Sequence, residues 1–264
     1  MKSPMVELEI PGSIIFTVPT KTVLKYGKDL ERIADTWYQI MEEIQWLVGY
    51  RFPKPMRYAT DVEISIGGQH SGYPAMAMPL IGDFVDFEYI FSGDVWGLYH
   101  EIGHNLQESR WVPKDAGETT CNIIPVMVNS KLFNEDYTAE FYNSVKYFKK
   151  AGQTLKILQS RASHWEYLSS YVGPHFEFGW TPFKETFAEI LKLPKRFNPD
   201  NDESKHSFWA KTMSLKTGHN LIPYFQWWAW EINQEAIDAT KHLPVWEMVD
   251  NLNDKKCKLH DLFY

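Results

Sequence analysis

The stretch of sequence that decides the fold is His100-Glu101-Ile102-Gly103-His104. Around it, from Val95 to Leu106, apolar residues recur every three or four positions, which predicts one buried stripe along an α-helix. Directly upstream, Ser92-Gly93-Asp94 provides residue types that cap helix N-termini. We therefore expect a helix over about residues 95–106 that carries both histidines.

His100 and His104 lie four positions apart and are neighbours on one face of such a helix. A ring nitrogen from each can bind the same tetrahedral ion, and Glu101 can reach a water molecule held on that ion. This is the His-Glu-x-x-His pattern of zinc-dependent hydrolases, in which the glutamate is the general base. Because so short a pattern also arises by chance on solvated helix faces, a third ligand is needed to support a zinc site.

Glu118 is the expected third ligand, because a catalytic zinc takes three protein ligands and keeps one position open. The alternative, Glu108, lies eight residues after His100, about 12 Å along a helix axis, and is too far away to share the ion. Residues 110–117 contain a proline and a glycine that let the chain turn back before Glu118. Asn122, one turn later, is expected to support the site by hydrogen bonding. An acidic residue in the first turn of a helix is also favoured by the helix dipole without any metal.

The segment after Glu118 is predicted to be a second helix that reaches about residue 132. Its apolar stripe consists of Cys121, Ile124, Val128 and Leu132. The opposite, polar side carries Glu118, Asn122 and Asn129. Pro125 can bend this helix. Cys121 lies close to Glu118 in the sequence, but its place in the apolar stripe favours a buried structural thiol over a metal ligand.

The remaining patterns indicate a mixed N-terminal part and a helical C-terminal part. Residues 13–18 are predicted to form a strand, residues 21–48 one long helix, and residues 58–66 a half-buried strand in which apolar and polar residues alternate. By analogy with other zinc peptidases, the strand at 58–66 is expected to border the cleft above the metal helix. The chain is thus expected to be an α+β protein, with a small mixed β-sheet in its N-terminal lobe.

Length and composition fit one domain over residues 1–264, with an N-terminal α/β lobe at about 1–110 and a helical lobe at about 111–264. The net charge of −7 and the lack of a long Lys/Arg run argue against a nucleic-acid partner. No stretch has the roughly 20 apolar residues that span a bilayer, and the first residues do not form a signal peptide. We therefore expect a cytoplasmic location, unless the chain is an excised domain of a secreted protein.

Three further residues are candidates for contacts with the substrate or with the oxyanion that forms on it. Tyr73 and His70 lie in the loop that follows residue 66, and each either donates a hydrogen bond to the reacting group or only shapes the loop. His219 lies in a Gly-His-Asn turn, where helix-capping chemistry is the alternative. The chain also has 11 tryptophans, which favour an aromatic core over a sugar-binding surface.

The motifs together resemble the enhancin and mucinase type of zinc peptidase, a gluzincin family. The likeness rests on residues 100–107 (HEIGHNLQ), Trp111 and residues 118–122 (ETTCN). It extends to residues 70–74, 178–180 and 217–225, and it looks strongest for the animal branch that includes the TRP channel-associated factors. The resemblance implies a zincin-like metallopeptidase fold, with His100, His104 and Glu118 as ligands of one Zn²⁺ per chain and Glu101 as general base.

These observations lead to two expectations of function. The first is a zinc-dependent endopeptidase in which Glu101 activates a metal-bound water, and the resemblance implies glycosylated, mucin-like proteins as its substrates. The second is a catalytically silent peptidase-like module that binds and regulates a membrane channel or another protein. The intact motif favours the first, and the missing export signal favours the second.

Overall fold

The computed structural model describes residues 3–78, 90, 95–160, 164–194 and 201–248. The chain divides into two compact units. Unit 1 consists of Met1–Leu106 and Ile124–Glu135, and unit 2 of Gln107–Ile123 and Asp136–Tyr264. Within the described part of the chain, no helix is both long enough and apolar enough to cross a lipid bilayer.

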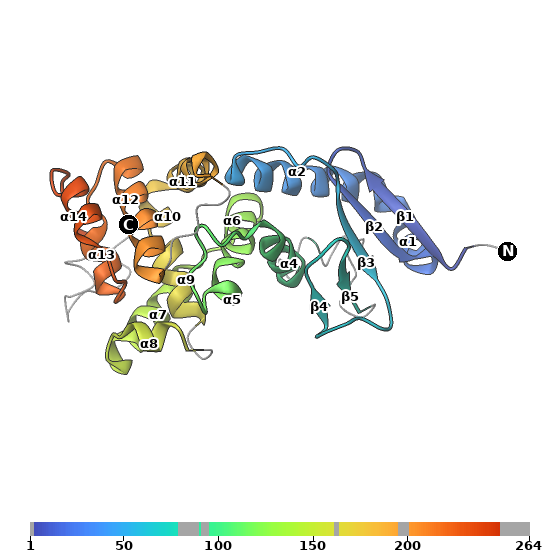
Figure 1. The fold of residues 1–264 in the computed structure, drawn as a ribbon. Coiled ribbons are helices and arrows are strands. Elements are labelled where there is room, and N and C mark those ends of the chain that lie inside the picture. Colours follow the sequence, from blue (N-terminus) through green and yellow to red (C-terminus); the bar gives the residue numbers. More distant parts are fainter. Residues whose placement is uncertain (1–2, 79–89, 91–94, 161–163, 195–200, 249–264) are drawn as a thin grey trace. The chain divides into compact units, whose positions relative to one another are not determined.

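Unit 1 is built on a small mixed β-sheet, as the sequence predicts (Figure 1). Its strands are β1 (Met5–Ile10), β2 (Ile14–Pro19), β3 (Met56–Thr60), β4 (Gln69–His70) and β5 (Ala75–Ala77), in the order β1-β2-β3-β5-β4. The β1–β2 and β4–β5 pairs are antiparallel, whereas β2–β3 and β3–β5 are parallel. Among the described residues, β1 and β4 are therefore the two edges of the sheet.

The strand predicted at 13–18 is confirmed as β2, but the strand predicted at 58–66 is wrong beyond Thr60. Among the described residues, the partner of β3 on that side is the short strand β5, and their pairing ends at Thr60 and Ala77. The chain then turns, and the Glu63 N–H donates to Asp61 Oδ1 at 3.3 Å. Val62 and Ile66, predicted to be buried, are 78% and 71% exposed. Their alternation with acidic residues belongs to a loop that does not continue the β3 strand.

The long helix predicted at 21–48 is two helices, so that prediction is wrong at its N-terminal end. The segments are α1 (Thr20–Tyr26), a 3₁₀ turn (Gly27–Asp29) and α2 (Leu30–Val48). Gly27 has a weak intrinsic tendency to continue a helix, and the interruption leaves Leu24 66% exposed. The α2 helix ends at Gly49, which adopts a left-handed conformation with φ 78°.

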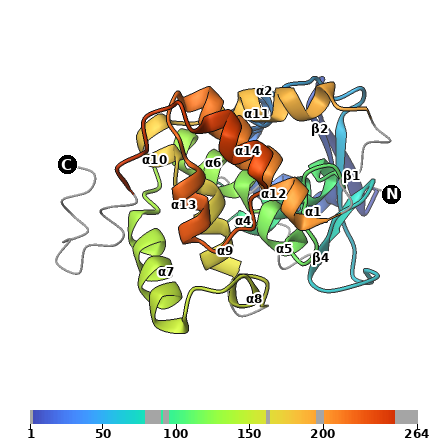
Figure 2. The same ribbon diagram turned by 60° about the vertical axis from the view of Figure 1, so that its left-hand side comes forward.

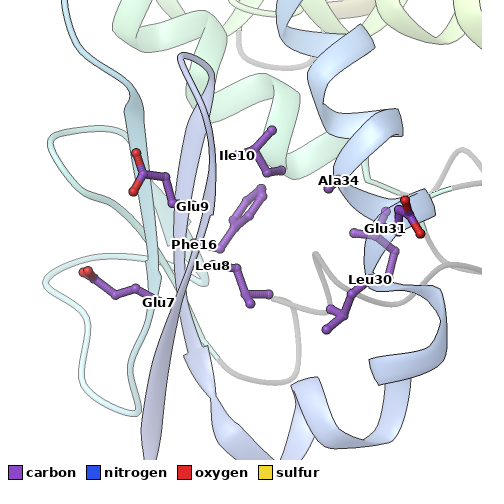
Figure 3. Close-up of a pocket in the computed structure, with 9 residues that line it drawn as sticks. Glu7, Leu8, Glu9, Ile10, Phe16, Leu30, Glu31 and Ala34 are labelled. Carbon is purple, nitrogen blue, oxygen red and sulfur yellow. The ribbon is translucent and has the colours of Figure 1, made fainter.

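The core of unit 1 lies between the sheet and α2. Leu8, Ile10 and Phe16 point from the β1–β2 hairpin toward α2, around a cavity of about 350 Å³, whereas Glu7 and Glu9 point away from it (Figure 3). Farther along α2, the ring centres of Phe16 and Trp37 lie 5.0 Å apart.

The predicted metal-binding helix is confirmed as α4 (Trp96–Leu106). Its apolar stripe is buried through Leu98, Tyr99 and Ile102, and Tyr99 packs edge-on against Trp37 of α2 at 5.8 Å. The predicted capping residues 92–94 lie outside the described residues.

The second helix, predicted at 118–132, is interrupted, so its continuity is wrong. The structure has a single turn, α5 (Gly117–Thr120), and then α6 (Ile123–Leu132). Pro125 has no N–H to bond the carbonyl of Cys121 and would clash with it, so it is tolerated only in the first turn of a helix. The helix therefore starts again at Ile123. Cys121 is buried, and so are Asn122 and Asn129 of the predicted polar side.

Unit 2 is helical in the residues that the structure describes, apart from one isolated bridge between Asn220 and Val245. Besides α5, its helices are α7 (Thr138–Ala151), α8 (Leu155–Leu158), α9 (His164–Val172), α10 (His175–Phe178), α11 (Thr181–Lys192), α12 (Asp202–Thr217), α13 (Ile222–Trp227) and α14 (Gln234–Thr240). The α12 helix contacts both α11 and α14 (Figure 2). The core is aromatic: Tyr171 packs on Trp209 and Trp230 at 5.3 and 4.6 Å, and Phe148 stacks on Trp228 at 5.1 Å.

Candidate metal centre

The two histidines of the motif converge on α4. Their Nε2 atoms are 3.1 Å apart and their ring planes meet at 86°, and both residues are half-buried. Two nitrogens bound to one tetrahedral zinc, each at about 2.0–2.1 Å, are separated by about 3.3 Å. The spacing of His100 and His104 therefore fits two ligands of one ion.

Glu101 lies one position further round the same helix and is only 8% exposed. Consecutive residues of an α-helix are rotated by about 100°, so its carboxylate leaves the helix beside the two rings and not between them. A general base needs this arrangement, because it must reach a water on the ion without binding the ion itself.

Glu118 lies in the single turn α5 and is exposed. The coordinating atoms of His100, His104, Glu118 and Cys121 all lie within 4.8 Å of one another. Imidazole nitrogen, carboxylate oxygen and thiolate sulfur are the ligand types of protein zinc sites, so the donor set fits zinc. Cys121 is fully buried, as predicted, yet its sulfur is within this cluster, which the sequence pattern did not indicate.

Hydrogen bonds from neighbouring residues hold the turn that carries Glu118. The Asn122 amide donates to the backbone oxygen of Glu118 at 2.8 Å, so it supports the main chain that carries the candidate ligand. The Gln107 amide donates to Gly117 O at 2.6 Å and to Thr120 Oγ1 at 2.7 Å. Sequence reasoning missed this role of Gln107, and the only signal was its position three residues after the second histidine.

Glu108, the competitor for the third ligand position, has another partner. Its carboxylate accepts a hydrogen bond from Arg110 Nε at 2.5 Å. Arg110 is buried and also donates to Ile190 O and Leu193 O, at 2.9 and 2.7 Å. Glu108 therefore neutralises a buried guanidinium, in line with its rejection as a ligand.

Glu118 also lines a polar pocket of unit 2 with a volume of about 520 Å³, together with Asp115, Gln159 and His164. Thr119 Oγ1 and His164 Nδ1 are 3.5 Å apart. These side chains present several hydrogen-bonding groups next to the candidate ligand. Gln159 and His164 lie more than 40 residues beyond Glu118, and no sequence motif marked them.

The candidate substrate residues have local partners. Both ring nitrogens of His70 are within hydrogen-bonding distance of nearby oxygens, Ser65 Oγ at 3.0 Å and Ser71 O at 2.9 Å. His219 Nδ1 lies 3.0 Å from Thr217 O at the C-terminus of α12, which is the capping geometry given above as the alternative. Tyr73 is 49% exposed, and the Lys54 ammonium lies 3.4 Å from its ring centre. Their roles toward a substrate remain predictions.

Known proteins resemble this chain over most of its length. At 33% identity over 247 residues, the chain matches the TRPM8 channel-associated factor 2 of Bos taurus, covering 89% of this chain and 26% of that protein. It is 30% identical over 256 residues to the TRPM8 channel-associated factor homolog of Xenopus laevis, covering 94% and 28%. The chain thus spans about a quarter of the length of these relatives.

Solved structures share the fold. A metallopeptidase from Bacteroides thetaiotaomicron superposes with a TM-score of 0.75 at 15% identity, covering 93% of this chain and 48% of that one. The IMPa metallopeptidase of Pseudomonas aeruginosa superposes with a TM-score of 0.67 at 14% identity, covering 92% and 36%. The fold is therefore the α+β, zincin-like metallopeptidase fold that the resemblance implied. The family described as peptidase M60, enhancin and enhancin-like matches residues 1–229, and the chain belongs to it.

Proposed function

We propose that this protein is a zinc-dependent endopeptidase whose ion is bound by His100, His104 and Glu118. The observation that carries the proposal is the convergence of their coordinating atoms within 4.8 Å, in a chain of a peptidase family. With three protein ligands, the ion keeps the open position that hydrolysis requires.

When bound, zinc makes a coordinated water acidic and polarises the carbonyl of the peptide bond. Glu101 would accept a proton from the water that adds to the carbonyl carbon. Glu101 then returns the proton to the nitrogen of the leaving amine, so that one carboxylate serves as base and acid in turn.

Unit 1 offers an edge along which an extended substrate can lie. In the described part of the chain, β4 is the last strand of the sheet, and it contacts α4. An extended peptide pairs with an edge strand through its main chain. The strand that borders the cleft above the metal helix is therefore proposed to be Gln69–His70, in place of residues 58–66.

Glycosylated proteins are the proposed substrate class. One solved structure shows the IMPa metallopeptidase with T-antigen, and another shows a metallopeptidase with Tn antigen. For this chain, the polar pocket beside Glu118 supports the proposal, because sugar hydroxyls need several hydrogen-bonding partners.

Metal analysis and paired glutamate variants test the proposal. Purified protein should contain about one zinc per chain, and Glu118→Gln should lose it. Glu108→Gln is the matched control, because its amide oxygen still accepts from Arg110, and it should keep both zinc and hydrolysis. Glu101→Gln should keep zinc but cleave a glycoprotein about 10²–10⁴ times more slowly. Protein that binds no zinc, or that cleaves equally well with Glu101→Gln, contradicts the proposal.

A second candidate function follows from the curated relatives, which are named as channel-associated factors. In this case the chain is a peptidase-like module that binds a membrane channel without cutting it. The two functions separate if wild type and Glu101→Gln are equally inert toward glycoproteins while both retain the same channel in a pull-down.

A further inference from the structure

Unit 1 contains an aromatic groove with a volume of about 400 Å³. Three rings, those of Tyr50, Phe52 and Tyr73, line it together with Pro53, Pro55 and Met56. Tyr50 is 38% exposed and Tyr73 49% exposed, so part of each ring is accessible to a ligand.

The groove has fixed walls. On one side, the Phe52 N–H donates to the buried Gln45 Oε1 at 2.9 Å, and the rings of Tyr50 and Phe52 pack edge to face at 5.6 Å. On the other side, the Asn105 amide accepts from Gly72 N at 2.9 Å and donates to Gly72 O at 3.0 Å. These paired bonds hold the loop that carries Tyr73.

The groove begins next to the candidate metal ligands. Asn105 and Leu106, which line it, directly follow His104 on α4. Consecutive Cα atoms are about 3.8 Å apart, and an extended peptide advances about 3.1–3.4 Å per residue. The groove and the candidate metal ligands thus share the C-terminal end of α4, and a peptide in the groove would need only a few residues to reach the metal centre.

The lining chemistry favours a proline-containing segment over a sugar. A sugar needs several side-chain hydrogen-bonding partners around its hydroxyls, and this lining is mostly apolar: Asn105, its one amide among the described residues, already accepts from Gly72 N and donates to Gly72 O. Besides Lys54, the hydroxyls of Tyr50 and Tyr73 are the other polar side-chain groups there. Flat aromatic faces set among prolines match the polyproline helix, whose rings pack on aromatic residues and whose carbonyls accept hydrogen bonds from tyrosine hydroxyls. Among the described residues that line the groove, Lys54 is the only charged one, and its ammonium lies over the Tyr73 ring.

We propose that the aromatic groove binds a proline-containing, extended stretch of the substrate polypeptide, a few residues from the bond that is cut. This inference rests on the proposed function for the identity of its ligand, but the binding itself needs neither zinc nor hydrolysis.

Direct binding measurements test it on Glu101→Gln protein, which does not cut the probe. The probes are a labelled proline-rich decapeptide and the same peptide with alanine at every proline. Fluorescence anisotropy measures the affinity of the protein for each of them. We expect the proline peptide to bind about tenfold more tightly, and Tyr50→Ala or Tyr73→Ala to weaken it about five- to tenfold.

Two variants control this experiment. Tyr38→Ala removes a tyrosine that is 48% exposed on α2 outside the groove, and it should leave the affinity unchanged. Tyr73→Phe keeps the ring and removes the hydroxyl, and it should retain most of the affinity that Tyr73→Ala loses. Circular dichroism checks that each variant is folded.

The outcomes separate this inference from the proposed function. Equal affinity for the two peptides, or equal loss in Tyr38→Ala and Tyr73→Ala, overturns the groove assignment even if the protein cuts glycoproteins. Competition by free N-acetylgalactosamine, without any proline preference, identifies a sugar platform and overturns it as well. Proline-dependent binding in protein that holds no zinc supports the groove and removes only the claim that its ligand is a substrate.

Discussion

Glu101, Glu108 and Glu118 are three glutamates within 18 residues that have three different environments. Glu101 is buried on α4, Glu108 pairs with the buried Arg110, and Glu118 lies exposed in the turn α5. The sequence alone predicted that Glu108 is not a metal ligand, because eight residues of helix place it too far from His100. The partner of Glu108 could not be predicted, since the burial of Arg110 depends on carbonyls about 80 residues away.

Whether Cys121 is a fourth ligand decides whether the metal centre has a free position for water. Its sulfur lies within the donor cluster, and a site with four protein ligands is closed and structural, whereas three ligands leave room for water. We expect Cys121→Ala to keep about one zinc per chain and full hydrolysis, with stability lower by about 1 kcal/mol from the lost buried thiol. Chelator competition measures the zinc affinity, with His104→Ala as the variant that loses the metal. Loss of zinc from Cys121→Ala would instead indicate a closed site.

Gly173 is a residue at which a single methyl group disrupts the packing of unit 2. A Cβ there would lie 2.1 Å from Tyr224 Oη and 2.8 Å from a ring carbon of Phe141, and both rings are buried. We expect Gly173→Ala to lower the free energy of unfolding by about 1–3 kcal/mol. Gly27→Ala is the control, because its Cβ would meet nothing within 4 Å, and it should be neutral or slightly stabilising. Equal urea midpoints for the two variants would refute the steric explanation.

At the scale of elements, β4 fixes the position of the metal helix through one side chain. Tyr58 Oη donates to Gln69 Oε1 at 2.6 Å, and the Gln69 amide fills the space beside Gly97 of α4. Gly97 precedes His100 by three residues and His104 by seven, so all three share one face of the helix. Strand β4 therefore lies against the face that carries the metal ligands.

Substitution of Gly97 should displace this contact and leave stability almost unchanged. A Cβ at Gly97 would lie 2.3 Å from Gln69 Nε2, so Gln69 must move and lose its bond to Tyr58. The lost bond costs about 1 kcal/mol, which the higher helix propensity of alanine roughly offsets. We expect Gly97→Ala to melt within a few degrees of wild type while hydrolysis falls about tenfold or more, because small displacements at a catalytic site are costly. A variant with normal activity would show that β4 does not position the helix.

Elements were predictable where one periodicity dominated the sequence. The α4 helix followed from its apolar spacing, because Leu98, Tyr99 and Ile102 of that stripe are buried. The alternation at 61–66 was misleading, since a strand also needs a partner and β5 is too short to provide one. The breaks at Gly27 and before Pro125 depended on single residues, and a periodicity averaged over many positions does not show them.

At the scale of the whole molecule, two buried histidines make stability depend on pH. His206 is fully buried, lies 2.7 Å from Tyr167 Oη and stacks on Trp230 at 4.4 Å, and this burial lowers its pKa to about 3. Burial likewise lowers the pKa of His175 to about 4. Both belong to unit 2. Nothing in the sequence marked either histidine, because burial is set by the packing of distant helices.

Acid should therefore destabilise the protein before its carboxylates protonate. Both histidines are neutral in the folded state, whereas the unfolded chain binds protons below about pH 6.5, so stability is complete above that pH and falls below it. At pH 5 the loss is roughly 2 kcal/mol for each histidine. Urea unfolding at pH 7.5 and pH 5.0 measures it, and His206→Gln should show about half the wild-type difference. An unchanged difference in His206→Gln would assign the effect to other groups.

The division into two units could not be predicted from the sequence patterns. Residues 124–135 belong to unit 1, although the segments on both sides of them belong to unit 2. Helical periodicity tells which face of a segment is buried but not which neighbour covers it. The lobes expected at about 1–110 and 111–264 simply follow the order of the chain. Chain order does not show that residues 124–135 return to the first unit.

The aromatic core of unit 2 also determines what an optical measurement of this protein can detect. Eight of the 11 tryptophans belong to unit 2, and only Trp37, Trp46 and Trp96 belong to unit 1. Intrinsic fluorescence is consequently weighted toward unit 2. A shift in emission reports mainly on the unit that holds Glu118 and the buried histidines, whereas a loss of order around α4 would change only the smaller contribution of Trp96, on α4 itself, and of Trp37, which packs against Tyr99.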